Sequence, residues 1–129
     1  MIEQSIYILT CMILGFMVFF SFVVAPSTFK LLNEKNSRIF IRGIFPLYYL
    51  LNLTISLIVV FLISYLGDFS LDFYLMLLIC SLFLVSNFIL MPLINKFKDS
   101  GKEKKFKISH FISVAINFVQ MIFLVLIIT

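Results

Sequence analysis

Charged residues are scarce in this chain. They make up 12% of its 129 residues, whereas about a quarter of the residues of a soluble domain are charged. Between its apolar runs the sequence has no stretch long enough for a soluble domain, a linker or a low-complexity segment. The shortage of charge therefore argues against a soluble globular protein.

Several catalytic motifs are also missing. The sequence contains no HExxH, no CxxC, no glycine-rich phosphate loop and no pair of carboxylates inside an apolar run. Metalloprotease, thiol-redox and carboxylate-dyad mechanisms therefore lack their parts. The single histidine, His110, has no cysteine at its depth and cannot complete a closed zinc site. We predict no catalytic residues and no metal ligands, and the sequence favours a non-enzymatic protein.

Only two cysteines occur, Cys11 and Cys80, and both lie inside apolar runs at similar depth. A disulfide between them would require adjacent helices and tight geometry. Buried thiols that act as small apolar side chains are the favoured interpretation.

Hydrophobic residues, in contrast, form 63% of the chain, and the mean hydropathy is +1.19. They gather into four runs, each long enough to cross about 30 Å of hydrocarbon as a helix. The runs lack the alternating pattern of barrel strands. We predict one domain over residues 1–129, an all-α, antiparallel, integral membrane four-helix bundle. Its predicted spans cover residues 5–28, 43–66, 73–94 and 108–128.

The distribution of charge predicts an orientation. Residues 29–42 carry a net charge of +3 and residues 95–107 carry +4, whereas the segment between the second and third runs has only Asp68 and Asp72. Because basic loops stay in the cytoplasm, we expect loops 29–42 and 95–107 to be cytoplasmic in an inner cell membrane. Both termini would then lie on the non-cytoplasmic side. Binding of anionic lipid at residues 96–107 is an alternative use of this charge, although topology alone explains it. Nucleic-acid binding is not expected.

Four polar residues fall at similar depth, near the middle of the predicted bilayer when counted at 1.5 Å per residue. They are Ser21, Asn52, Asn87 and Asn117. Polar side chains in membrane helices usually face the bundle interior. We interpret these four as a structural belt that bonds the helices together, and a small polar cavity is the alternative.

A second polar group is expected at the cytoplasmic edge, within about two helical turns of the inner boundary. It contains Arg42, Tyr49, Asn95 and His110, which we predict to bind a small ligand, an ion or a partner. His110 would be the proton-sensitive group, Arg42 would pair with an anion, and Tyr49 and Asn95 would form hydrogen bonds. Anchoring at the membrane interface is the alternative role. Pro26 predicts a helix kink beside this level.

The sequence is also compatible with two other functions. His110 with Met91 or Met17 would suit a haem-binding oxidoreductase or electron carrier, although methionines in so apolar a chain favour packing. The chain would also suit a homo-oligomer, or an assembly or stabilising subunit of a larger membrane complex.

Four stretches together resemble a known family. They are "GFMVFFSFVVAPSTFKLL", "RGIFPLYYLLN", "MPLINKFKDSG" and "FKISHFISVAINFVQ". In this order they are similar to a family of small four-helix transmembrane proteins of unknown function, which includes the eukaryotic transmembrane protein associated with platinum-drug resistance. The fold more distantly resembles the copper-resistance protein D group and the bacterial membrane-bound protoporphyrinogen oxidase. The resemblance implies family positions at Gly15, Pro26, Phe29, Phe45, Pro46, Tyr48 or Tyr49, Pro92, Asn95, Asp99, His110, Ser113 and Asn117.

Overall fold

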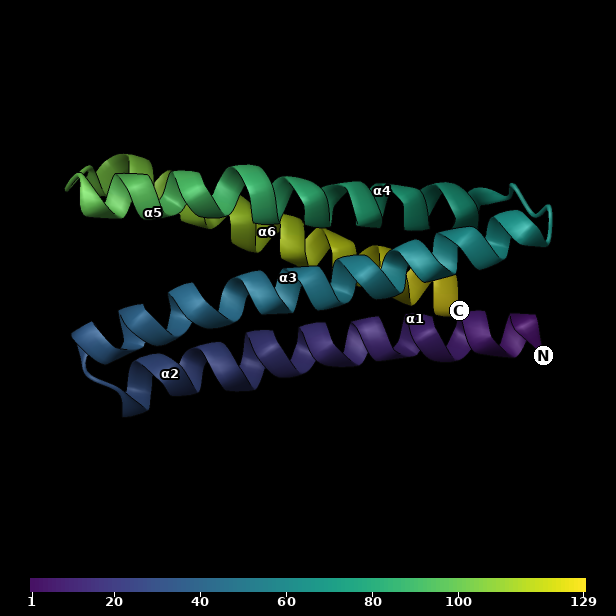
Figure 1. Cartoon of the computed structure of the whole chain (residues 1–129), viewed down its shortest axis with the longest axis horizontal. Helices are drawn as coiled ribbons and strands as arrows, with labels where there is room; N and C mark the ends of the chain where they lie inside the picture. Colours follow the sequence, from purple (N-terminus) through teal and green to yellow (C-terminus); the bar gives the residue numbers. More distant parts are fainter.

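The computed structural model describes all residues, 1–129, and every regular element in it is helical. Three connections divide the helical segments into four rods (Figure 1). In chain order the segments are α1 (Ile2–Phe19), η1 (Phe20–Val24), α2 (Ala25–Leu31), α3 (Glu34–Tyr65), α4 (Leu71–Val85), η2 (Ser86–Leu90), α5 (Met91–Asp99) and α6 (Glu103–Ile128), where η marks a π-helix.

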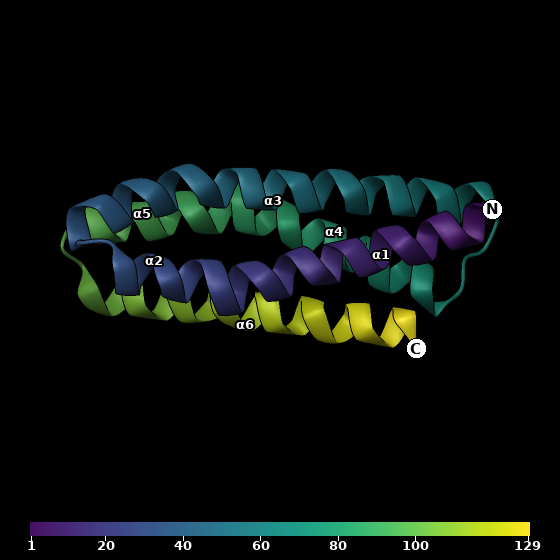
Figure 2. The ribbon, with the colours of Figure 1, turned by 90° about the horizontal axis from the view of Figure 1, so that it is seen from below.

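The rods run antiparallel and pack as a square. The neighbours are α1 with α3, α3 with α4, α4 with α6, and α6 with α1, whereas no Cα atoms of α3 and α6, or of α1 and α4, come within 8 Å. Both termini lie at the same end (Figures 1 and 2). The fully buried apolar core contains Ile13, Met17, Val59, Met76, Ile79, Phe83 and Leu124. All four rods are apolar enough to cross a membrane, so the predicted all-α bundle is confirmed.

The basic segments are helical, which differs from the loops predicted at 29–42 and 95–107. Only two residues join α2 to α3, and three join α5 to α6. Asn33 begins α3 by accepting a hydrogen bond from the backbone N–H of Asn36 at 2.8 Å. Lysine, arginine and glutamate are good helix formers. The charge therefore marks where the chain leaves the hydrocarbon and does not mark where the helix ends.

Glycines end two of the helices. Gly67 follows α3 with φ of 70° and Gly101 follows α5 with φ of 68°. In both turns the N–H after the glycine bonds the carbonyl five residues earlier, from Asp68 to Ile63 and from Lys102 to Phe97. This is the Schellman arrangement, which requires a left-handed residue.

The first and the third rod in chain order each contain a π-helix just before a proline. The sequences are similar, Ser21-Phe22-Val23-Val24-Ala25-Pro26 and Asn87-Phe88-Ile89-Leu90-Met91-Pro92. Proline has no N–H for the carbonyl one turn back, and a π-helix is one way for a helix to accommodate that loss. At Pro26, where the sequence predicts a kink, the helix continues to Leu31, and the Thr28 hydroxyl donates to the Val24 carbonyl at 2.7 Å.

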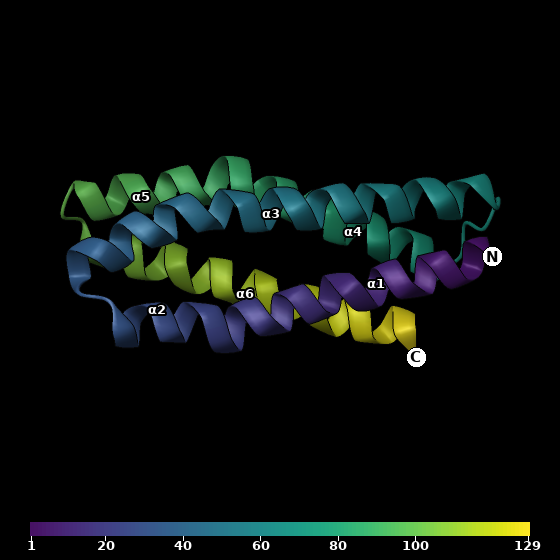
Figure 3. The same cartoon turned by 60° about the horizontal axis from the view of Figure 1, so that its bottom comes forward.

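The bundle divides into two hairpins at the end away from the termini. There α2 packs against α3 and α5 packs against α6, but no Cα atoms of α2 and α6, or of α3 and α5, come within 8 Å. Figures 1 and 3 show α3 diverging from α5 toward this end. We call it the basic end, because all ten lysines and arginines lie in the segments that meet there.

Candidate functional site

Two adjacent tyrosines of α3 reach across the bundle to α6. The Tyr48 hydroxyl donates to Asn117 Oδ1 at 2.9 Å, and the Tyr49 and Ser113 hydroxyls lie 3.4 Å apart. Both tyrosines are almost fully buried. Because α3 and α6 lie on a diagonal of the square, these hydrogen bonds cross the middle of the bundle.

Each π-helix contributes a serine to this region. Asn117 Nδ2 donates to Ser21 Oγ of η1 at 2.8 Å, and the buried Ser86 of η2 lies beside the Tyr49 hydroxyl. We call these residues the tyrosine network: Ser21, Tyr48, Tyr49, Ser86, Ser113 and Asn117. All four rods are therefore joined in or around one polar region.

Aromatic rings pack around the two tyrosines of the network. The Phe20 ring stacks on Tyr48 with centroids 4.2 Å apart, and Phe45 meets the rings of both tyrosines, with its centroid 5.8 Å from that of Tyr49. On the α4 side, Phe83 approaches Tyr49 with centroids 6.5 Å apart. These apolar walls keep the tyrosine hydroxyls in a medium where hydrogen bonds are stronger than in water.

Two buried amides near the network are only half satisfied. Asn52 Nδ2 donates to the Tyr48 carbonyl at 2.9 Å, and Gln120 Nε2 donates to the Ile79 carbonyl of α4 at 3.0 Å. Both side chains are fully buried, yet Asn52 Oδ1 and Gln120 Oε1 have no hydrogen-bond partner. Each such unpaired acceptor costs about 1–3 kcal/mol.

The residues of the predicted belt have different roles. Asn117 and Ser21 bond each other between α6 and η1. Asn52 bonds a carbonyl of its own helix, and the half-buried Asn87 makes no hydrogen bond. The interhelical bonds at this level therefore run from Asn117 to a serine and a tyrosine, and they do not join one asparagine to another.

An ion pair joins the two hairpins at the basic end. Arg42 of α3 binds Asp99 of α5 through both guanidinium nitrogens, at 3.2 and 2.5 Å. Asp99 lies five residues past the apolar run that ends at Ile94, and its side chain is 54% exposed. The hydrogen bond from Arg42 lowers the pKa of the Asp99 carboxyl. The other salt bridge of the chain, between Arg38 and Glu34, lies within α3, so this pair is the only salt bridge between the hairpins.

The four residues predicted to bind a ligand have separate surroundings, and no hydrogen bond joins any two of them. Arg42 pairs with Asp99, and Tyr49 belongs to the tyrosine network. Asn95 is half-buried without a hydrogen bond, and His110 is exposed.

The His110 ring stacks on Phe106, with centroids 5.9 Å apart and planes 10° from parallel. The two methionines considered with it as haem ligands, Met17 and Met91, are both buried among the core residues. No three side chains of histidine, cysteine, aspartate or glutamate form a group that could hold a metal ion, and Cys11 and Cys80 are both free thiols.

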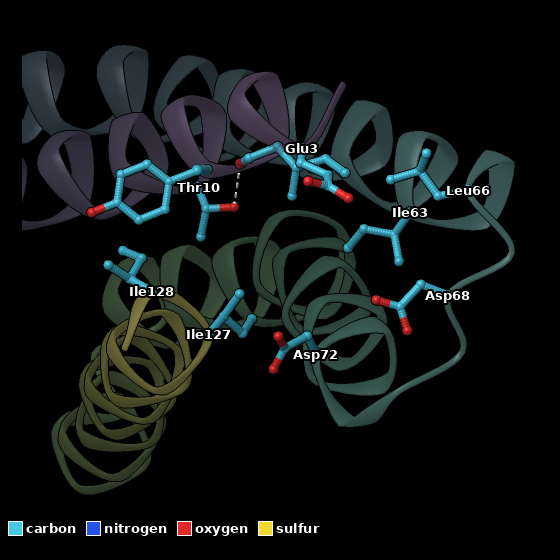
Figure 4. A pocket seen from close by; sticks show the side chains of 10 residues that line it. Glu3, Thr10, Ile63, Leu66, Asp68, Asp72, Ile127 and Ile128 are labelled. Carbon is cyan, nitrogen blue, oxygen red and sulfur yellow. Dashed lines mark hydrogen bonds between the residues drawn. The ribbon is translucent and has the colours of Figure 1, made fainter. Parts of the chain in front are cut away.

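A separate pocket of about 380 Å³ lies at the opposite end, where the termini are. Figure 4 shows the carboxylates of Glu3, Asp68 and Asp72 around it, with Thr10 and Ile127 also in its lining. No arginine or lysine pairs with these carboxylates. The charges of the chain are thus separated, with only acidic residues at this end.

Four packed apolar rods with all basic residues at one end define a multi-pass membrane protein. Residues 8–103 match the family described as Domain of unknown function (DUF4149). The chain belongs to this family, and the match includes α3 and both π-helices but ends at the first residue of α6. No curated protein and no solved structure matches the chain.

Proposed function

We propose that this chain is a non-enzymatic membrane protein that binds a small hydrogen-bond-donating ligand between its two hairpins. The observation that carries the proposal is the pair of fully buried acceptors without partners, Asn52 Oδ1 and Gln120 Oε1. Buried polar groups are normally hydrogen-bonded. A ligand that donates hydrogen bonds, such as an ammonium or amine group, would satisfy these oxygens.

The residues of the tyrosine network would form the wall between this ligand and the basic end. Tyr48 and Tyr49 already use their hydroxyls with Asn117 and Ser113, so they would line the ligand region without donating to the ligand. Arg42 and Asp99 would close the space between the hairpins. Asn95 and His110, which have no hydrogen-bond partner, would contact the ligand at the rim on its way in.

Access from the basic end can be tested with a reagent of the same chemical class. In a background without Cys11 and Cys80, Ser113→Cys places a thiol inside the network, and Val114→Cys places one on the exposed, lipid-facing side of α6. We expect 2-aminoethyl methanethiosulfonate, which carries an ammonium group, to modify the thiol at position 113 in reconstituted vesicles. Modification is measured by mass spectrometry of the intact protein.

The control thiol at position 114 should react far more slowly, because thiolates do not form in hydrocarbon. Adding Asn52→Leu to Ser113→Cys should slow modification, since the acceptor for the ammonium group is lost. If position 113 stays unmodified, or if Asn52→Leu has no effect, the ligand site is refuted.

The proposal also includes the orientation of the protein in the membrane and its relationship to another family of membrane proteins. We propose that the basic end faces the cytoplasm of a cell whose inner membrane holds the protein, which the separation of basic and acidic residues supports. Relationship to the small four-helix proteins associated with platinum-drug resistance is supported by the quoted motifs, which fall at Pro26, Tyr48, Asp99 and Asn117.

A further inference from the structure

The lysines of the basic end have no carboxylate partners. Both salt bridges of the chain use arginine, from Arg38 to Glu34 and from Arg42 to Asp99. Two of the three acidic residues at this end are therefore already neutralised, which leaves Glu103 alone. Six of the eight unpaired lysines lie within residues 96–107, at the turn between α5 and α6.

This turn is held together by two reciprocal contacts between lysines and aromatic rings. The Lys98 ammonium of α5 lies 4.9 Å from the centroid of Phe106 in α6, and the Lys105 ammonium of α6 lies 5.8 Å from that of Phe97 in α5. Both distances are typical of cation–π interactions. The Schellman turn at Gly101 fixes the two helix ends against each other. The two lysines are thus positioned, although their side chains are exposed.

The depth of these ammonium groups suits lipid headgroups. Lys98 is four residues beyond Ile94 and Lys105 is three residues before Ile108, which places their backbone about 4.5–6 Å outside the apolar runs at 1.5 Å per residue. The headgroup region is about 5–7 Å thick on each side of the hydrocarbon. Each ammonium can still donate hydrogen bonds away from the ring beneath it.

We propose that the α5–α6 turn binds the phosphate of an anionic phospholipid, with Lys98 and Lys105 as the two principal donors. The lipid tails would lie along the exposed apolar faces of α5 and α6, which include Leu93, Ile108 and Phe111. The phosphate of a lipid is concentrated at this depth because the lipid is part of the leaflet. A soluble phosphate has no apolar part that could contact the apolar faces of α5 and α6. Basic sites at the ends of membrane helices are known to select anionic lipids.

The test compares two double variants that remove the same charge. The wild-type protein, K98Q/K105Q and K30Q/K35Q are each reconstituted in vesicles of equimolar phosphatidylglycerol and phosphatidylcholine. Each is then extracted in mild detergent, and the retained lipids are quantified by mass spectrometry. We expect phosphatidylglycerol to be enriched with the wild type and with K30Q/K35Q. With K98Q/K105Q the enrichment should fall at least about fivefold, as expected for losing lysines near a membrane surface.

A third variant, K98R/K105R, keeps the charge and should keep the enrichment, which separates loss of binding from loss of folding. Rising salt should reduce the enrichment, because exposed charges are screened. Equal losses in K98Q/K105Q and K30Q/K35Q would show a diffuse charge effect and overturn the site. Displacement of phosphatidylglycerol by inorganic phosphate would identify a free-anion site and would likewise overturn the lipid assignment.

Discussion

Asn117 joins three of the four rods, because it lies on α6, accepts from Tyr48 of α3 and donates to Ser21 of η1. Asn117→Leu keeps the branched shape of the side chain but removes both hydrogen bonds. Interhelical hydrogen bonds in membranes contribute about 0.6 kcal/mol on average and up to about 1.7. We expect the variant to lose about 1–2 kcal/mol of unfolding free energy, measured by thermal or denaturant unfolding in detergent.

Asn87 provides a matched control for this prediction, since it is also an asparagine of a membrane helix but makes no hydrogen bond. Asn87→Leu should change the unfolding free energy by less than about 0.5 kcal/mol. Equal effects of the two substitutions would show that the network at Asn117 does not stabilise the bundle.

The ion pair between Arg42 and Asp99 should affect how readily the two hairpins separate at the basic end more than it affects the stability of the bundle. Their side chains are 33% and 54% exposed, and exposed ion pairs contribute at most about 1 kcal/mol. Asp99→Asn should therefore leave thermal stability nearly unchanged but increase the rate at which Ser113→Cys is modified. The exchanged pair R42D/D99R should return the rate toward that of the parent. An unchanged rate in Asp99→Asn would exclude the ion pair as a closure between the hairpins.

At the scale of helices and turns, substitution of two glycines by alanine is expected to change the melting temperature in opposite directions. Gly101 ends α5 with φ of 68°, and a side chain there costs about 1–2 kcal/mol. Gly43 lies inside α3, and a Cβ there would meet nothing within 4 Å. Alanine at Gly101 should lower the melting temperature, whereas alanine at Gly43 should raise it by removing a poor helix former. If both substitutions shifted the melting temperature in the same direction, the result would contradict the left-handed turn assigned at Gly101.

The sequence predicts the helices better than the contacts between them. Four apolar runs give the four rods, because length and hydropathy are local properties. The helices extend beyond the predicted spans at residues 29–31, 34–42, 95–99 and 103–107, because lysine and arginine mark the aqueous boundary while still favouring helix.

The tyrosine network could be predicted only in part. The spacing of His110, Ser113, Asn117 and Gln120 predicts that they share one helical face. Ser113 and Gln120 are buried and Asn117 is half-buried, whereas His110 is exposed. Their partners could not be derived, because the crossing from α3 to α6 depends on which rods lie on the diagonal. The Arg42–Asp99 pair joins residues 57 positions apart, and in the sequence only the family resemblance indicates Asp99 as a position of interest.

For the whole molecule, the separation of charge predicts its orientation. A C-terminal fusion to alkaline phosphatase should be active in a bacterial host, and the same fusion to green fluorescent protein should be dark, because Ile128 would lie outside the cytoplasm. The reverse pattern would refute the orientation. Replacing the six lysines of residues 96–107 by glutamine should weaken this preference, since basic residues retain a loop in the cytoplasm.

The two π-helices have a consequence for the symmetry of the molecule. Pro92 follows Pro26 by 66 residues, and similar residues precede both. The rods that contain them lie on one diagonal, and α3 and α6 lie on the other. In this arrangement, a two-fold rotation about the long axis of the bundle would exchange the rods of the first hairpin with those of the second, and this axis would be parallel to the membrane normal. The tyrosines of α3 face a serine and an asparagine of α6 across it, so the pseudo-symmetry is broken at the network itself, where the two halves of the chain carry different side chains.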